Sequence, residues 1–479
     1  MRDDDDHLFP DPPRSWRREL AETFELAWPL VLTQLAQMAI YSTDVLMIGR
    51  LGATELAASA LAVNLYSVFL FTGQGLVTAA APLVAAELGA RRHSVREVRR
   101  TVRMALWAAF LFSLPAMLIL WHGEAILLAL GQDAELSRRS AEFMRALQWA
   151  MFPTLAIVVL RYFVAALGRP GVALAVTLVA VLVNLLGNWV LIYGHWGLPR
   201  LGLIGSGLAS AITYTFGALV LAAIIQFHSN FRRTYVFGRL FRPDWKRLGE
   251  IVRIGTPIAF TLAFEVTVFS AAVYLMGLID RTSVAAHAIA LQIAAITFMV
   301  PLGISQATTI RVGLAYGARD PAWVSKAGSA SLVMSLGFMS LAALTIWSFP
   351  RELASLFLDA SRPENAPVLD LAVKFLLIAA IFQLADGAQV IGAAMLRGLQ
   401  DTRIPMIYAF IGYWLVGLGG GALLAFWVGW KGEGVWTGLA LGLLMVAVLM
   451  LWRWNRRGRL GLVPKNLRPI VIESDPSAE

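Results

Sequence analysis

Residues 57–62 read AASALA, and residues 285–290, 228 positions further along, read AAHAIA. The alignment runs without a gap from Pro29 to Arg91; it pairs Pro29 with Pro257 and continues until Gly89-Ala90-Arg91 meets Gly317-Ala318-Arg319. An internal repeat of this length in an apolar chain indicates two structurally equivalent halves. Two like halves that meet in a bilayer, with a substrate site between them, are a common construction of transporters.

The composition excludes an ordinary soluble domain. Of 479 residues, 58% are hydrophobic and 15% are charged, whereas a soluble domain carries about a quarter charged residues. The charges cluster between long apolar runs, which is the pattern of membrane-spanning helices and not of a β-barrel. The absence of cysteine excludes disulfides and thiolate metal sites, and the six histidines have no zinc-ligand spacing. We expect no cofactor.

Twelve apolar segments are long enough to cross a bilayer as helices, which takes about 20 residues each. We predict spans at 24–48, 58–81, 101–121, 147–167, 172–193 and 203–226, and then at 255–278, 284–308, 328–349, 371–396, 405–427 and 435–454. The predicted fold is an all-α integral membrane protein with twelve transmembrane helices in two pseudo-symmetric six-helix halves.

The division of the chain follows from these spans. We expect a disordered cytoplasmic tail at 1–20, an N-terminal lobe at 21–227, a basic cytoplasmic linker at 228–253, a C-terminal lobe at 254–455 and a cytoplasmic tail at 456–479. The acidic, proline-rich start lacks the features of a signal peptide. The linker is either an amphipathic segment on the inner leaflet or a solvated connector.

Lys and Arg set the orientation. With both termini in the cytoplasm, 29 of the 40 basic residues face the cytoplasm, 10 face the other side and Arg161 lies inside a span. This excess predicts that both termini are cytoplasmic. The same distribution accounts for the net charge of +9 without a nucleic-acid partner.

Three carboxylates lie inside predicted spans, where an ionisable group costs about 2.5–3.5 kcal/mol. They are Glu265, Asp386 and, nearer a span end, Asp44. No Lys or Arg lies at that depth in the spans of Glu265 and Asp386, so these two must take up a proton or bind a cation. For Asp44 a snorkelling or capping role stays open. Arg161, the only mid-span cation, either neutralises a carboxylate or holds backbone carbonyls.

Other polar residues join these acids in stripes at helical spacing. The stripes are Gln34, Gln37, Tyr41 and Asp44; Thr177, Asn184 and Asn188; Thr261 and Glu265; and Gln383, Asp386 and Gln389. Such stripes must face the protein interior or a wet cavity. For the amides, hydrogen bonding between helices is the alternative. The repeat pairs Gln37 with Glu265, so the halves share a scaffold but not their charges.

Prolines and glycines add two expectations. Pro29 and Pro257 lie at equivalent places near the start of the first helix of each half, where they fit moving helices or static kinks. The last two predicted helices are rich in glycine, including Gly417, Gly421 and Gly438, which indicates close helix packing.

An ordered set of residues resembles a known family. The set is Asp44 ahead of Gly49; Asn184 and Asn188 ahead of Tyr193-Gly194; Pro257 eight residues before Glu265; and Asp386 ahead of Leu396-Arg397-Gly398 and Asp401-Thr402. Over residues 20–455 the chain resembles the multidrug and toxic compound extrusion (MATE) family, and its NorM-like branch in particular.

The resemblance implies an antiporter, not an enzyme, that exports organic cations in exchange for Na⁺ or H⁺ as its halves rock around a central cleft. In the NorM-like branch a glutamate of the seventh helix and an aspartate of the tenth form a cation site. These positions match Glu265 and Asp386, which the resemblance assigns as Na⁺ ligands. The branch has a tyrosine one turn before that aspartate, whereas this chain has Phe382, so one oxygen contact to the ion is lost.

Some relatives hold a second site in the N-terminal half, made by an aspartate, an asparagine, a second acid and a threonine. Asp44 and Asn184 match the first two, Asn188 stands in place of the second acid, and Thr213 matches the threonine. We therefore assign cation coupling to Glu265, Asp386 and Asp44. The supporting and substrate-cleft residues are Gln34, Gln37, Tyr41, Asn184, Asn188, Thr213, Phe382 and Gln383.

We expect a monomer, surrounded by membrane lipid, whose substrates are organic cations and drugs. The alternative is a flippase for lipid-linked precursors in the same superfamily, but such proteins have a strongly basic cavity and here the interior charge is mostly acidic. A membrane enzyme would need a clustered catalytic set, which the sequence lacks.

Overall fold

The computed structural model describes residues 15–90, 94–232, 234–238 and 240–463, and all regular structure in these ranges is helical. Twelve helices of this part of the chain are long and apolar enough to cross a membrane, which confirms the predicted number. The outer parts of the two predicted tails lie outside the described residues.

The spans of the first half are α1 (Trp16–Gly49), α2 with α3 (Ala53–Thr78, Ala80–Ala90), α4 (Ser94–Trp121), α6 with α7 (Ala134–Leu147, Met151–Ala166), α8 (Pro170–Tyr193) and α9 (Leu203–Phe227). Short helices α5 (Gly123–Ala129), η2 (Gln148–Ala150) and α10 (Ser229–Arg232) connect or interrupt them. α1 begins earlier than the predicted span because Ser15 caps it, accepting a hydrogen bond from the Arg18 backbone N–H at 3.2 Å.

The spans of the second half are α11 (Trp245–Ile279), α12 (Arg281–Gly317), α13 (Pro321–Ser348), α15 (Ala366–Gly398), α16 continued by η4, α17 and η5 (Arg403–Phe410, Ile411–Gly419, Gly420–Ala422, Leu423–Trp427), and α18 (Lys431–Asn455). Short helices α14 (Pro350–Ser355) and η3 (Pro363–Asn365) lie between α13 and α15. α11 extends into the predicted linker because Asp244 caps its first turn.

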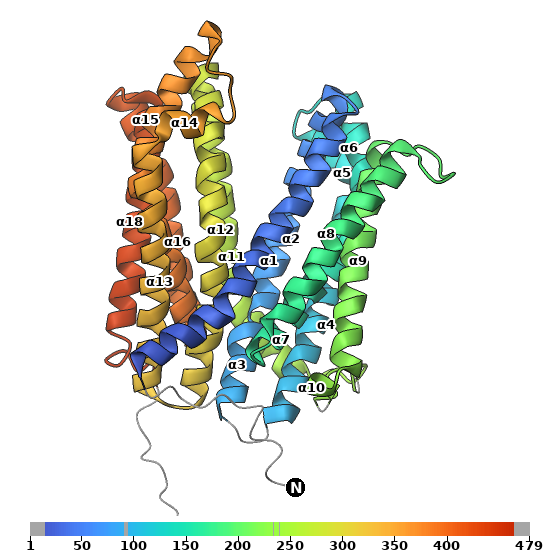
Figure 1. Cartoon of the computed structure of the whole chain (residues 1–479), viewed down its shortest axis with the longest axis vertical. Coiled ribbons are helices and arrows are strands. Elements are labelled where there is room, and N and C mark those ends of the chain that lie inside the picture. Colours follow the sequence, from blue (N-terminus) through green and yellow to red (C-terminus); the bar gives the residue numbers. More distant parts are fainter. Residues whose placement is uncertain (1–14, 91–93, 233, 239, 464–479) are drawn as a thin grey trace, which may run out of the picture.

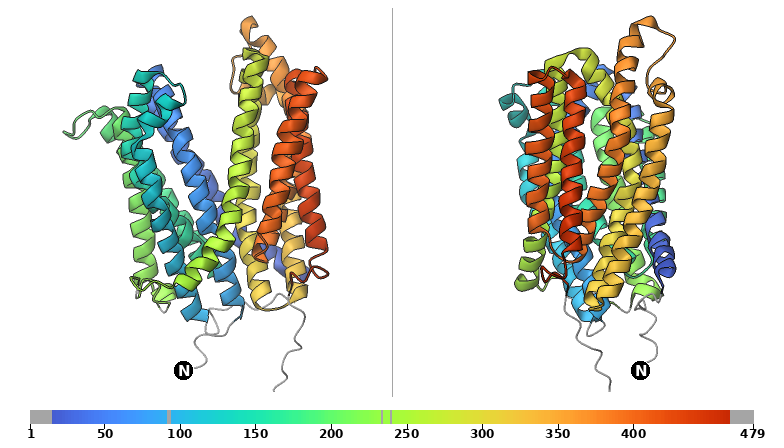
Figure 2. Two further views of the ribbon diagram at one scale, coloured as in Figure 1. Left: turned by 180° about the vertical axis from the view of Figure 1, so that it is seen from behind. Right: turned by 90° about the vertical axis from the view of Figure 1, so that its left-hand side faces the viewer.

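The helices form two bundles, α1 to α9 and α11 to α18 (Figure 1). The bundles approach each other at the end where α1 begins and α18 finishes, which we call the terminal end. They diverge toward the opposite end, which we call the open end (Figure 2). The structure therefore represents a conformation in which the two bundles are in contact at the terminal end and apart at the open end.

Glycines at equivalent positions of the repeat make close contacts between the bundles. A β-carbon on Gly75 would overlap the backbone of Ala259, and a β-carbon on Gly303 would overlap the backbone of Val31. The repeat pairs Gly75 with Gly303 and Val31 with Ala259. The two contacts are therefore equivalent under the repeat, and the glycine of each comes from a different half.

Nearer the terminal end the same reciprocity recurs. A β-carbon on Gly89 would overlap the Leu314 carbonyl oxygen, and one on Gly317 would overlap the Ala86 carbonyl oxygen. The repeat pairs Gly89 with Gly317 and Ala86 with Leu314. We call the four glycine contacts the seam. Glycine lets the two backbones approach this closely, which explains why the repeat is so clear in these segments.

The first helix of each half leaves its own bundle to reach the other. α1 packs against α8 in the first half but also against α12 and α13, and α11 packs against α2 and α4 as well as α16. Each helix contains its proline, and α1 is visibly bent (Figure 1). The hydroxyls of Thr33 and Thr261 donate to the carbonyls of Pro29 and Pro257 at 2.7 and 2.9 Å.

The glycines of the last two spans pack closely, as the sequence predicts. A β-carbon on Gly438 would overlap Gly421, and one on Gly442 would lie 2.6 Å from the Gly417 Cα. The partner segment is π-helical over Ile411–Gly419, a wider winding than the α-helix. This winding decides which side chains of that span point into the bundle.

Candidate functional site

Asp386 lies at the centre of the polar cluster in the second half. α15 buries it to 5% exposure, and the Gln389 side-chain amide, one turn further, donates to its Oδ1 at 3.2 Å. The Tyr413 hydroxyl, on the π-helical segment, donates to Gln389 Oε1 at 2.8 Å. A buried carboxylate is thus held by a short chain of hydrogen bonds that links two helices.

Glu265 approaches the same cluster from α11. It is half-buried, and it interacts electrostatically with Asp386 and Tyr413. Two carboxylates in one apolar environment repel each other when both are charged. A proton or a bound cation removes that repulsion.

Arg397 interacts with one of these acids from outside the predicted span. It lies at the end of α15, beyond the predicted span, and its guanidinium interacts electrostatically with Glu265 and with Tyr162 of the first half. Within the described residues it forms no ion pair with either acid at contact distance. Its long side chain extends the charge well beyond the position of its own Cα.

Phe382 and Gln383 occupy different surroundings. Phe382 is buried in an aromatic cluster, with its ring centroid 5.8 Å from that of Trp436 and 6.2 Å from that of Phe269. Gln383 is fully buried, and neither atom of its amide has a hydrogen-bond partner among the described residues. The hydroxyl that joins the hydrogen-bond chain around Asp386 comes from Tyr413 and not from the position of Phe382.

Asp44 is the centre of a second cluster, in the first half. Its Oδ1 accepts hydrogen bonds from the amides of Asn184 at 3.0 Å and Asn188 at 2.6 Å, and its Oδ2 accepts one from the Ser210 hydroxyl at 2.8 Å. The structure therefore brings together the three residues that the spacing singled out. The amide oxygens of Asn184 and Asn188 are buried without a partner in the described part of the chain.

The other residues of the first-half stripes are less close to the acid. Thr213 is buried, but its hydroxyl donates to the Ala209 carbonyl of its own helix, so Ser210, one turn away, makes the contact to Asp44 instead. Gln37 is half-buried and Tyr41 is exposed, and neither side chain forms a hydrogen bond with another described residue.

Arg161 binds neither of its expected partners. It is buried, its Nη1 donates to Gln34 Oε1 at 3.3 Å, and its guanidinium lies 5.9 Å from the ring centroid of Tyr162. Its Nε has no partner among the described residues. The stripe residue Gln34 is thus tied to the one mid-span arginine of α7.

Three contact residues escaped the sequence reasoning, namely Tyr413, Ser210 and Arg397. Ser210 gave a weak signal in the sequence, because it lies on the same helical face as the predicted site residue Thr213. Tyr413 gave none, because the π-helical winding departs from the α-helical spacing on which stripes are recognised.

Neither cluster has the composition of a divalent metal centre. Within the described residues no group of three or more His, Cys, Asp or Glu side chains could hold a metal ion. Carboxylate and amide oxygens are hard ligands that suit an alkali cation or a proton.

At the terminal end, an ion-pair network ties α1 to the second half. Glu19 is fully buried and binds Arg311 of α12, whose Nε lies 2.9 Å from Glu19 Oε1. The Trp323 indole N–H donates to Glu19 at 3.0 Å, and Glu22 binds Arg311 at 2.8 Å from a more exposed position.

A second network ties α11 to the first half. Arg247 binds Glu87 of α3 at 2.9 Å and Glu97 of α4 at 2.7 Å. The repeat, extended to the helix starts, pairs Glu19 with Arg247. Glu19 and Arg247 therefore occupy equivalent positions with opposite charges, and each binds residues of the other bundle. We call the two networks the latches.

The sequence pattern of the MatE family matches residues 29–190 and 257–423, the two halves of the repeat. The chain belongs to the MatE family. The relatives of this MatE protein include a probable multidrug resistance protein NorM of Mesorhizobium japonicum, 53% identical, which spans 94% of this chain and 96% of that protein. A protein with the same description from Brucella suis is 49% identical over 92% of this chain and 94% of its own length.

Solved structures share the fold at low identity. A mutant of the Vibrio cholerae MATE transporter VcmN matches with a TM-score of 0.85 and 17% identity, over 95% of this chain and all of that one. The eukaryotic MATE transporter AtDTX14 matches with a TM-score of 0.81 and 21% identity, over 93% and 99%. The MatE protein is thus a multi-pass membrane protein with the transporter fold of its family.

Proposed function

We propose that this MatE protein exports organic cations and related drugs across a bacterial inner membrane in exchange for Na⁺ or H⁺. The observation that carries the proposal is the acid pair, in which buried Asp386 is held by a chain of hydrogen bonds through Gln389 and Tyr413 and half-buried Glu265 interacts with it electrostatically. The description of the relatives as multidrug resistance proteins supports the choice of cargo.

The acid pair provides a site for one positive charge at a time. Asp386 and Glu265 bind Na⁺ through carboxylate and amide oxygens, or take up a proton, and either event removes their mutual repulsion. A lipophilic organic cation is attracted by the same negative charge and by aromatic side chains nearby. Entry of the coupling ion therefore favours release of the drug.

Exchange also requires that each ligand favour a different conformation. In the state described above, the bundles are apart at the open end and joined by the seam and the latches at the terminal end. We propose that the halves rock about the seam, so that the latches break when the terminal end opens. The Lys and Arg count assigns the terminal end to the cytoplasm, and the coupling ion then enters from the outside.

The cluster around Asp44 is proposed as a second cation position. A carboxylate and the two unpaired amide oxygens of Asn184 and Asn188 supply oxygen ligands for an alkali cation. A single negative charge makes this site weaker than the acid pair.

The test uses proteoliposomes loaded with a fluorescent organic cation, with a Na⁺ gradient or a pH gradient imposed separately. Efflux driven by one gradient identifies the coupling ion. Asp386→Asn should abolish this efflux, whereas Asp370→Asn, an exposed acid near the start of the same helix, should leave it unchanged. Efflux under neither gradient would refute exchange.

That negative outcome would favour the flippase alternative. A solved transporter of the MOP superfamily from Pyrococcus furiosus, described as having a binding pocket of reverse polarity and a different function, shares the fold with a TM-score of 0.81 and 19% identity. The fold alone therefore does not decide the cargo, and the acidic pair is the feature that favours cations.

A further inference from the structure

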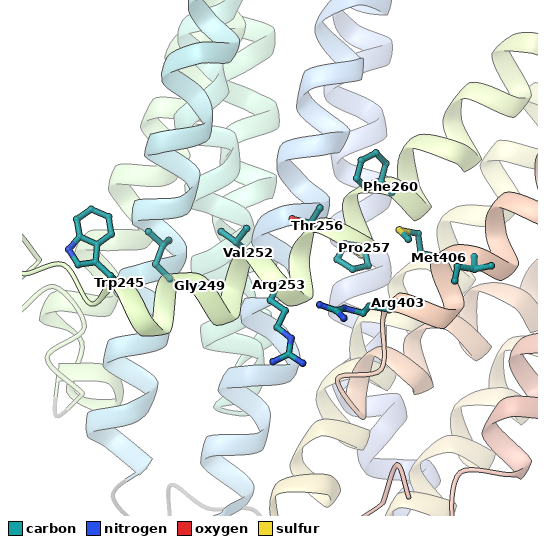
Figure 3. A pocket seen from close by; sticks show the side chains of 11 residues that line it. Trp245, Gly249, Val252, Arg253, Thr256, Pro257, Phe260, Arg403 and Met406 are labelled. Carbon is teal, nitrogen blue, oxygen red and sulfur yellow. The ribbon is translucent and has the colours of Figure 1, made fainter. Parts of the chain in front are cut away.

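A groove of about 820 Å³ lies between α11 and α16 near the terminal end (Figure 3). Its lining includes Trp245, Val252, Arg253, Phe260, Arg403 and Ile407, and none of its eleven lining residues is acidic. Apolar side chains and two arginines thus share one hollow on the outer surface of the helices.

The two arginines have no partner in the described part of the chain. Arg253 and Arg403 are exposed, and within the described residues neither forms a hydrogen bond or an ion pair. Figure 3 shows both guanidinium groups at the same side of the groove, Arg253 from α11 and Arg403 from the start of α16. Two like charges held side by side repel each other unless an anion lies between them.

A neighbouring arginine on α11 does have partners. Arg247, less than two turns before Arg253 on α11, is neutralised by Glu87, Glu97 and Glu250. At the position equivalent to Arg253, the first half carries Glu25. The shared scaffold therefore does not require a basic residue here, and the charge belongs to this groove.

The groove has the layout of a lipid site. Trp245 is 66% exposed at the start of α11, in the place where tryptophan marks the membrane interface. Phe260 and Ile407 are exposed further along the two helices, and their apolar side chains suit an acyl chain. The guanidinium groups of Arg253 and Arg403 lie on the side of the groove opposite to Phe260 (Figure 3), which matches a lipid whose headgroup and acyl chain occupy opposite sides.

We propose that the groove binds an anionic phospholipid of the leaflet at the terminal end, with its phosphate between Arg253 and Arg403 and an acyl chain along Phe260 and Ile407. Basic pockets between transmembrane helices on the cytoplasmic side have this chemistry. The bound lipid bridges α11, which is latched to the first half, and α16 of the second half. Its binding therefore depends on the conformation of the transporter.

The test is native mass spectrometry of the full chain in detergent, titrated with phosphatidylglycerol or with phosphatidylcholine of the same acyl chains. The wild type should bind one phosphatidylglycerol with clear preference over phosphatidylcholine. Each arginine near a charged headgroup contributes about a fivefold change in affinity, so Arg253→Gln with Arg403→Gln should weaken phosphatidylglycerol binding by about 30-fold.

The matched control is Arg17→Gln with Arg459→Gln, which removes the same charge from exposed positions at the terminal end outside the groove. This control should keep the wild-type preference. Thermal unfolding in both lipids provides a second measurement, because only variants with the groove arginines should gain stability from phosphatidylglycerol. Equal preference in the groove variant and the control would overturn the proposal, and so would a wild type that binds both lipids alike.

Discussion

The latch at Glu19 provides the sharpest prediction about conformation. Replacing Glu19 by Gln keeps the shape of the side chain but removes the charge that neutralises Arg311 inside the protein. If the latch holds the terminal end closed, the variant should populate the state in which that end is open. The change acts far from both acid clusters, so it separates conformation from ion binding.

The magnitude follows from the contacts. Glu19 is fully buried and accepts from two nitrogens of Arg311, from the Trp323 indole and from the Thr23 hydroxyl. Removing one partner of a buried ion pair costs about 3–5 kcal/mol. Glu22 still faces Arg311, which favours the lower figure. About 3 kcal/mol corresponds to a change of about 150-fold in the ratio of the two conformations.

The chain itself suits the assay, because it contains no cysteine. Cysteines introduced at Leu130 and Leu356, which are 67% and 77% exposed at the open ends of the two bundles, provide positions for spin labels. The distance distribution between the labels should be long in the wild type and should shift to shorter values in Glu19→Gln.

The control is Glu22→Gln, which changes the partly exposed partner of the same arginine. In this variant the fully buried Glu19 still neutralises Arg311, so it should keep most of the wild-type distribution. Thermal unfolding in nanodiscs checks that both variants fold. If folded Glu19→Gln gives the wild-type distribution, the latch does not control the opening of the terminal end.

Three further predictions concern the seam and the acid pair. Gly317→Leu places a side chain against the Ala86 carbonyl, so the same pair of labels should report loss of the state closed at the terminal end. Asp386→Asn should abolish gradient-driven efflux at wild-type expression, as measured in proteoliposomes. Tyr413→Phe removes the hydrogen bond to Gln389, worth about 1 kcal/mol, and should weaken the apparent affinity for the coupling ion about fivefold in titrations of transport rate.

Much of the fold can be read from the sequence because a bilayer imposes simple requirements. Length and apolarity predict the twelve spans, and the repeat predicts their pairing into halves. The cluster of Asp44, Asn184 and Asn188 was also predictable, since polar stripes on two helices must face each other rather than lipid.

Other features depend on geometry that a pattern does not carry. The repeat shows that Gly75 and Gly303 are equivalent. It does not show that Gly75 packs against Ala259 and Gly303 against Val31 across the seam. Tyr413 reaches Gln389 because its helix is π-wound, and Arg397 approaches Glu265 because its side chain is long. Helical periodicity records neither effect.

The most direct test of the central claim is a binding competition at the acid pair. Binding of a fluorescent organic cation to the detergent-solubilised protein is measured while Na⁺ or pH is varied, for the wild type, Asp386→Asn and Asp44→Asn. We predict that Na⁺ or acid displaces the organic cation from the wild type and from Asp44→Asn, and that Asp386→Asn loses this dependence. Displacement that persists unchanged in Asp386→Asn would contradict exchange of the two cations at this site.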